Sequence, residues 1–266
     1  MSIAKVSDIC MYYEEYGEGE PLLITSGWSH AERAFGHHRE LLASEYRCIR
    51  HEHRGIGRTD APPGPYSTAT MGDDLAGLLD HLGVKSARVL GGGGMGALVA
   101  AQLAIRHPQK VRSLYLGSPA VKVDPFFREV LEVWKALRRL DKKLWCREAN
   151  LWCYTPETYK EHTEMALNSV NVRYEDNAFG TDAAFDNVID AYIAHDITDT
   201  VRNIQCPTLV TTGGWQDFIS GPRFAREVYA RISGAKLHIF ENTSHNYPHE
   251  AKAEWGRVTM EWLAAH

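Results

Sequence analysis

The sequence predicts an α/β protein built on a mostly parallel, doubly wound sheet. Short apolar runs recur along the chain without the alternation of a half-exposed strand, as expected of strands buried on both faces of a parallel sheet. Segments of helical periodicity separate several of these runs. A glycine-rich stretch, 91–96, joins an apolar strand directly to an alanine-rich helix. With 266 residues, of which 44% are apolar, the chain can bury the core of one large domain or two small ones.

The first half of the chain carries strand signals separated by a helix. Residues 1–16 alternate loosely and end in a glycine-containing turn, which predicts a hairpin before a core strand. Residues 21–25 and 46–51 are short runs that predict buried strands. Residues 70–82 place apolar side chains at helical spacing, and Gly83 follows where a glycine commonly ends a helix.

The second half changes character twice. A strand is predicted at 111–118, but no buried-strand run occurs between about 121 and 199. Helices are predicted in that interval at 126–140, 144–154 and 183–193. Strands return at 204–212 and 235–241, and a helix at 251–263 follows them. We therefore expect a core formed by residues 1–120 and 200–266, with a helical cap, 121–199, inserted after the sixth strand.

The glycine-rich stretch is the main functional signal. A strand that turns sharply into a helix holds one residue in a strained conformation, with small residues close by. The stretch resembles the nucleophile elbow, G-x-S-x-G, of the α/β-hydrolases. On that pattern Gly92 and Gly96 are the outer glycines, and the nucleophile position falls on Gly94. The elbow is present without the hydroxyl group.

The same glycines also fit G-x-G-x-x-G, the pattern of a dinucleotide site. That site requires an acidic residue near the end of the next strand to hold the ribose. The predicted strand at 111–118 carries no carboxylate. We therefore expect no cofactor.

Further segments resemble α/β-hydrolase motifs in the family's order. Residues 54–60 resemble its R-G-x-G-x-S-D turn, with threonine for serine. Asp217 follows a predicted strand, as in the family's G-x-x-D loop, and His245 follows the last predicted strand. The resemblance implies that His245 is the catalytic base and that Asp217 orients it. It also implies an oxyanion hole made by the backbone N–H groups of Trp28 and Met95.

These resemblances imply a hydrolase of a small apolar ester or lactone with a Ser-His-Asp mechanism. The motifs look most like those of the enol-lactonase and small-ester group. Carbon–carbon bond hydrolases share them, so the bond cleaved stays open.

Two explanations of Gly94 compete. In the first, which we favour because the rest of the apparatus is complete, the parent protein carries a serine there and this chain is an inactivated, substrate-trapping variant. In the second, the glycine is natural. His245 and Asp217 then act as a general base, or the chain is a non-enzymatic small-molecule binding protein.

Aromatic side chains are abundant in the predicted cap and in the loops near the motifs. Ligand pockets are mostly apolar and aromatic, so we expect an apolar pocket with few charges. The predicted substrate contacts are Trp28, Phe126, Trp134, Trp152 and Trp215. Such residues are also common in cores, and the sequence does not say which cap aromatics face the pocket.

Composition and charge exclude several other classes. The formal net charge is −5 and no basic patch occurs, which argues against a nucleic-acid partner. His51 and His53 would share a strand face, but no third ligand accompanies them, so no metal is expected. The number of cysteines, five, is odd and no C-x-x-C pair occurs, which indicates free thiols in a reducing compartment.

Location and assembly are predicted only coarsely. The first 16 residues have no basic segment followed by an apolar run, and no apolar stretch approaches the ~20 residues that span a bilayer. We therefore expect a cytoplasmic protein that does not enter a membrane, as a monomer or a homodimer.

Overall fold

A twisted sheet of eight strands organises the part of the chain that the computed structural model describes, residues 2–28 and 35–266. The strands are β1 (Ser2–Val6), β2 (Ile9–Tyr16), β3 (Glu20–Thr25), β4 (Tyr46–His51), β5 (Ala87–Gly91), β6 (Val111–Gly117), β7 (Thr208–Gly213) and β8 (Lys236–Phe240). Their spatial order is β1-β2-β4-β3-β5-β6-β7-β8. The pairs β1–β2 and β2–β4 are antiparallel, and all later neighbours are parallel. The predicted α/β class with a mostly parallel sheet is confirmed.

One local prediction at the N-terminus is wrong. The glycine-containing turn at 17–19 does not close a hairpin, because β4 lies between β2 and β3 in the sheet. The hairpin is instead formed by β1 and β2, which pair from Ser2 with Tyr13 to Val6 with Ile9. A turn signal marks where the chain reverses, but it does not say which strands then become neighbours.

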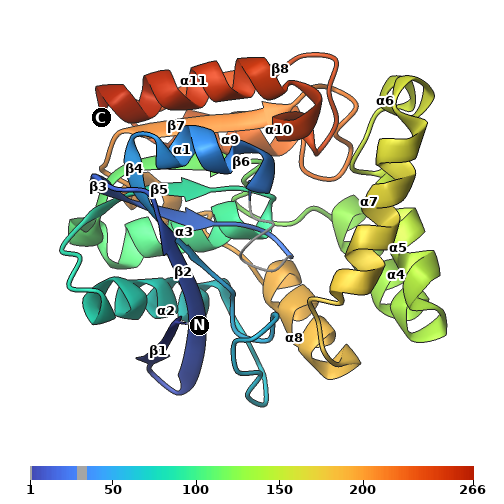
Figure 1. Cartoon of the computed structure of the whole chain (residues 1–266), viewed down its shortest axis with the longest axis horizontal. Coiled ribbons are helices and arrows are strands. Elements are labelled where there is room, and N and C mark those ends of the chain that lie inside the picture. Colours follow the sequence, from blue (N-terminus) through green and yellow to red (C-terminus); the bar gives the residue numbers. More distant parts are fainter. Residues whose placement is uncertain (1, 29–34) are drawn as a thin grey trace.

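Helices cover both faces of the sheet. They are α1 (Arg39–Ala43), α2 (Thr68–His81), α3 (Met95–Arg106), α4 (Pro125–Leu140), α5 (Lys142–Leu151), α6 (Pro156–Glu161), α7 (Thr163–Asp176), α8 (Asp182–Ile193), α9 (Pro222–Arg231), α10 (Tyr247–Glu250) and α11 (Lys252–Ala265). Buried residues of α2, α3 and α9 share one hydrophobic cluster, and those of α1 and α11 share a second. Figure 1 shows α2 and α3 on one side of the sheet and α1 and α11 on the other. Among the residues described, no helix is both long and apolar enough to cross a membrane.

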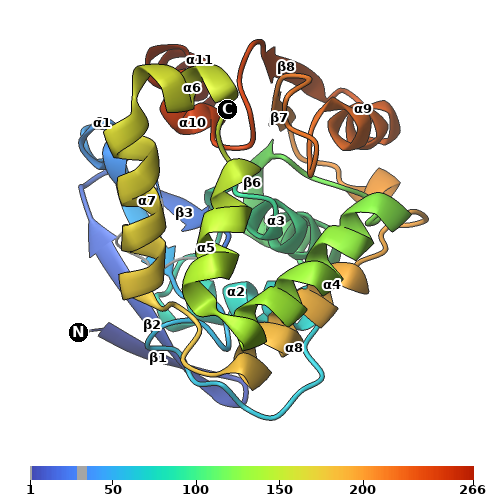
Figure 2. The same cartoon turned by 90° about the vertical axis from the view of Figure 1, so that its right-hand side faces the viewer.

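Helices α4 to α8 form an insert between β6 and β7, as predicted. An isolated antiparallel bridge between Lys122 and Asp196 joins the chain where it enters and leaves this insert. The insert lies at one end of the sheet (Figure 1), and α4, α5 and α7 lie in front of the core when seen from that side (Figure 2). The domain boundaries at 120/121 and 199/200 stay predictions.

The insert contains two helices that the sequence pattern did not predict, α6 and α7. The only buried residues of α7 are Ala166 and Val170, so it has no wide apolar stripe. By contrast α4 has a strongly amphipathic sequence and a clear start, since the Asp124 side chain accepts the N–H of Phe127 at 2.7 Å and Pro125 follows the cap. A helix such as α7, which buries only two residues, is not detected by a prediction that rests on hydrophobic periodicity.

Candidate active site

The turn between β5 and α3 has the geometry of a nucleophile elbow. Gly94 directly precedes α3 with φ 67° and ψ −84°, a conformation that a residue with a side chain adopts only under strain. A Cβ atom on Gly96 would collide with the carbonyl oxygen of Thr25 on the adjacent strand β3. The close approach of α3 to β3 therefore requires a glycine at 96. The turn leaves Gly94 buried and brings the preceding Gly93 to the wall of a cavity.

The N-terminus of α3 offers backbone donors at this turn. No side chain caps this end of α3 within the described chain, and the Gly94 carbonyl accepts the N–H groups of Ala97 and Leu98. Helix N-termini favour developing negative charge. The Met95 side chain is fully buried, so only its backbone N–H could contribute to an oxyanion hole. Trp28 follows the end of β3 by three residues and lines the cavity. The oxyanion role of both residues stays a prediction.

Asp217 and His245 are brought together from loops that follow β7 and β8. Their Oδ2 and Nδ1 atoms lie 3.4 Å apart, and Asp217 is only 2% exposed. A third residue, Ser220, lies between them, with its Oγ 2.7 Å from His245 Nδ1 and 3.4 Å from Asp217 Oδ2. The Ser220 backbone N–H also donates to Asp217 Oδ1 at 2.9 Å. Nδ1–H can thus be held by the serine and the carboxylate, which leaves Nε2 as the basic nitrogen.

Ser220 was missed by sequence reasoning. Aspartate followed three residues later by serine is a common turn pattern, in which the acid accepts the later backbone N–H. The pattern in itself does not indicate that the serine hydroxyl will contact a histidine 25 residues further along the chain.

Glu250 ties the histidine loop to the insert and was also missed. Its carboxylate accepts the backbone N–H of Ser244 at 2.7 Å and that of Thr155 at 2.9 Å. The Thr158 hydroxyl donates to the same carboxylate at 2.6 Å. In addition, Ser244 Oγ donates to the Trp152 carbonyl oxygen at 2.9 Å. The segment that carries His245 is therefore held by the start of α6 as well as by the core.

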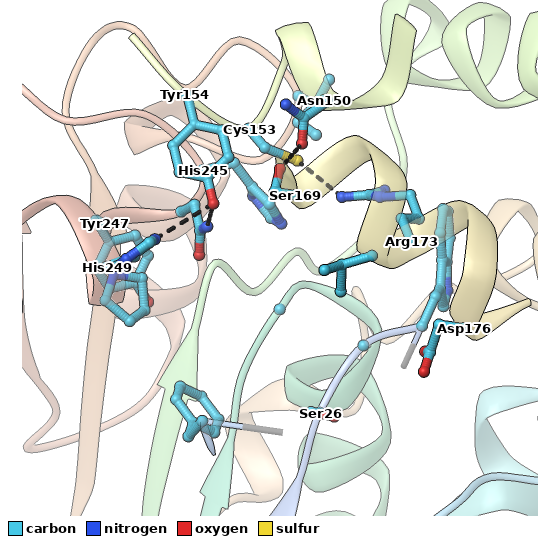
Figure 3. Close-up of a pocket in the computed structure, with 18 of the residues that line it drawn as sticks. Ser26, Asn150, Cys153, Tyr154, Ser169, Arg173, Asp176, His245, Tyr247 and His249 are labelled. Atoms are coloured by element: carbon cyan, nitrogen blue, oxygen red, sulfur yellow. Dashed lines mark hydrogen bonds between the residues drawn. The ribbon is translucent and has the colours of Figure 1, made fainter. Parts of the chain in front are cut away.

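A cavity of about 560 Å³ separates these loops from the insert, a volume typical of small-molecule sites. His245 and Gly93 line its core side, and Figure 3 shows His245 facing into it. Of the predicted contacts, Trp28 and Trp134 line the cavity, together with Phe127 and Tyr192.

The other three predicted contacts do not line it: Phe126, Trp152 and Trp215. Phe126 and Trp215 are 52% and 65% exposed on the surface. The Trp152 Nε1–H instead donates to Glu148 at 2.6 Å. Spacing within a helix shows which residues share a face, but it does not show which face looks onto the cavity.

The expectation of an apolar pocket with few charges is corrected by α7. This helix contributes Ser169, Arg173 and Asp176 to the cavity wall. Among the described residues, the Arg173 side chain forms one hydrogen bond. Its Nη2 atom donates to Cys153 Sγ at 3.5 Å (Figure 3). Burial raises the pKa of the Cys153 thiol, so it stays neutral and is a weak acceptor. The guanidinium thus brings a positive charge to one wall.

The histidine pair considered for metal binding is part of the core. Burial lowers the pKa of His53 to about 4. Its Nε2 lies 3.0 Å from the Ser26 carbonyl oxygen. His51 is also buried, and the two rings meet edge to face at 4.6 Å. In the described ranges no group of three or more His, Cys, Asp or Glu residues could hold a metal ion.

The sheet order and the loops that carry Gly94, Asp217 and His245 place the protein in the α/β-hydrolase class. The profile of the family described as serine aminopeptidase, S33, matches residues 22–252. The chain belongs to that family of serine hydrolases.

Named relatives and solved structures agree with this assignment. A protein named as a carbamate hydrolase, RutD, in Azorhizobium caulinodans is 30% identical over 211 residues, covering 79% of this chain and 78% of the relative. A thermophilic esterase from Thermogutta terrifontis superposes with a TM-score of 0.84 at 26% identity, over 99% of this chain and 97% of the esterase. The enol-lactonase from Burkholderia xenovorans LB400 superposes with a TM-score of 0.87 at 22% identity, over 99% and 100%, and shows the fold alone.

Proposed function

We propose that this chain hydrolyses a small ester or lactone bound in the cavity beneath the insert. The observation that carries the proposal is the convergence on one cavity of the elbow, through Gly93 next to Gly94, and of a half-buried histidine, His245, that contacts the buried carboxylate of Asp217. Named relatives include an esterase and a carbamate hydrolase, which supports hydrolysis at a carbonyl carbon.

The cavity walls suggest the shape of the substrate. Trp28, Phe127 and Trp134 form an apolar wall that suits an alkyl or aromatic group. Arg173, which α7 contributes to the lining, suits an oxygen-rich or anionic group. We therefore propose an ester or lactone with an apolar part and a polar or carboxylate-bearing part.

Without a hydroxyl at position 94, His245 acts on water rather than on a serine. Its Nε2 takes a proton from a water molecule, and the water oxygen bonds to the substrate carbonyl carbon. The N–H groups of Met95 and Trp28 stabilise the resulting oxyanion. The intermediate then expels the alcohol oxygen, which takes the proton back from Nε2. The products are a carboxylic acid and an alcohol, or a hydroxy acid from a lactone.

The hypothesis of an inactivated serine enzyme makes a different prediction. If a serine belongs at position 94, Gly94→Ser should raise the rate on aryl esters or lactones by several orders of magnitude. Position 94 has the strained backbone of a nucleophile, which supports this hypothesis. The position of the Tyr192 hydroxyl, 2.6 Å from where a Cβ atom at 94 would lie, supports a native glycine instead.

The proposal is tested by assaying the chain and its His245→Ala variant on a panel of aryl esters and lactones. We expect measurable turnover in the chain and its loss in His245→Ala, with ligand binding retained in both. Binding without turnover in every variant, including Gly94→Ser, would show instead a non-enzymatic binding protein.

A further inference from the structure

The Tyr192 side chain lies where the side chain of a nucleophile would be. A Cβ atom built on Gly94 would lie 2.6 Å from Tyr192 Oη, closer than real Cβ contacts allow, and 3.5 Å from Cζ, an ordinary contact distance. Among the described atoms, only this hydroxyl oxygen therefore conflicts with a Cβ atom at 94. The two residues are 98 positions apart and come from the elbow and from the last turn of α8.

Aromatic packing holds this hydroxyl in place. The Tyr192 ring meets Trp28 edge to face at 6.0 Å and Phe127 at 5.3 Å. The residue is only 3% exposed, and it lines the cavity. No hydrogen bond to its hydroxyl is formed by the residues that the structure describes. A polar atom that faces a cavity without a protein partner is available to a ligand or a water molecule.

The electrostatic surroundings keep the phenol protonated. Burial, and to a smaller extent the negative charge of Asp217, raises the pKa of Tyr192 above its ordinary value. A neutral phenol is a poor nucleophile and a poor general base, but it can accept one hydrogen bond and donate another. Its contribution is therefore to positioning, and His245 remains the base.

We propose that the Tyr192 hydroxyl replaces the missing serine side chain by holding the water molecule that attacks the substrate. This inference rests on the proposed function. The water donates one hydrogen to Tyr192 Oη and gives the other, as a proton, to His245 Nε2. Its oxygen forms the new bond to the carbonyl carbon, and the alcohol oxygen leaves with the proton from Nε2. Water is the only co-reactant, and no acyl-enzyme forms.

The steric part of the inference is tested without any activity. A double-mutant cycle in thermal unfolding compares the chain, Gly94→Ser, Tyr192→Phe and the double variant. We expect Gly94→Ser to lower Tm and the added Tyr192→Phe to recover part of that loss, because it removes the conflicting oxygen. The backbone strain of a serine at φ 67° is the same in Gly94→Ser and in the double variant, so it cancels when their Tm values are compared. Additive shifts would refute the placement of Tyr192 at the nucleophile position.

The catalytic part is tested by steady-state and burst kinetics on the best aryl ester of the panel. Tyr192→Phe should lower kcat by about threefold to tenfold with a small change in KM, as expected for the loss of one neutral hydrogen bond to the attacking water. The exposed Tyr229 on α9 provides the matched control, and Tyr229→Phe should leave kcat unchanged. Unchanged turnover in Tyr192→Phe would overturn the inference and leave the hydrolase proposal in place.

The double variant gives an independent readout. Gly94→Ser with Tyr192→Phe should show a burst of released alcohol, because the serine hydroxyl then has room and forms an acyl-enzyme. Gly94→Ser alone should show a smaller burst. Equal bursts in the two would contradict the steric role of Tyr192. Absence of turnover in every variant would instead overturn the proposed function, and with it the catalytic role of Tyr192.

Discussion

Asp217→Asn should abolish most of the catalytic activity while leaving the fold intact. In the structure, Asp217 Oδ1 accepts the Ser220 N–H at 2.9 Å, so the asparagine carbonyl oxygen would take this place. The amide NH2 would then face Ser220 Oγ and His245 Nδ1, where Oδ2 lies now. An NH2 group donates to Nδ1, so the ring proton moves to Nε2. The histidine then presents a donor to the water instead of a base.

The magnitude follows from the loss of the general base. A correctly positioned general base raises the reaction rate by about 10²- to 10⁴-fold. We therefore expect kcat/KM to fall by roughly 10³-fold, equivalent to about 4 kcal/mol of transition-state stabilisation. The assay is steady-state hydrolysis of the best panel ester, with thermal unfolding to show that the variant is folded.

Ser220→Ala is the matched comparison. It removes the hydroxyl 2.7 Å from Nδ1 but leaves the carboxylate, which can approach Nδ1 from its present 3.4 Å. We expect a loss of about tenfold or less, as for one neutral hydrogen bond. An equal loss in both variants would mean that Ser220 contributes as much as Asp217 to orienting the histidine. No loss in Asp217→Asn would refute the role of Asp217 in orienting His245.

Three further predictions concern stability and binding. Arg54→Met should destabilise the protein by about 3–5 kcal/mol in urea unfolding, because it leaves the buried Asp74 carboxylate without the two hydrogen bonds of 2.7 Å that Arg54 donates to it. Adding Asp74→Asn, which removes the buried charge, should recover part of this loss of stability. Burial lowers the pKa of His195 to about 4, so the unfolded chain binds more protons between pH 4 and 6.5, and stability should fall as the pH falls through this range. His195→Gln cannot ionise and should lose about 2 kcal/mol less than the parent between pH 7 and 5, and equal losses would contradict the buried neutral histidine. Arg173→Met should weaken the binding of carboxylate-bearing inhibitors about tenfold to a hundredfold in calorimetry, but leave the binding of their neutral amides unchanged. Equal effects on the two kinds of inhibitor would exclude a charge contact with Arg173.

Much of the fold was predictable because local patterns carry it. Buried strands such as β3 and β7 appear as apolar runs, and α4 appears as an apolar stripe with a clear N-cap. The insert helix α7 was not predictable, since it buries only Ala166 and Val170 and therefore has no apolar stripe. Its absence from the prediction explains why the pocket was expected to be more apolar than it is.

The candidate site was predictable only where a residue belongs to a local motif. Gly94 follows from the glycine-rich turn, and the structure brings Asp217 and His245 into contact as their positions after successive strands suggested. Of the aromatic residues predicted to contact substrate, Trp28 and Trp134 line the cavity, but Phe126 and Trp215 face solvent.

The sequence by itself determined the class of fold, the elbow at Gly94 and the acid–histidine pair. These depend on hydrophobic periodicity and on short motifs, which are properties of neighbouring residues. Only the tertiary structure decided that Ser220 lies between Asp217 and His245 and that the Tyr192 hydroxyl lies at the empty nucleophile position. Such contacts join residues far apart in the chain. They depend on how helices and loops pack in three dimensions, and no local pattern encodes that packing.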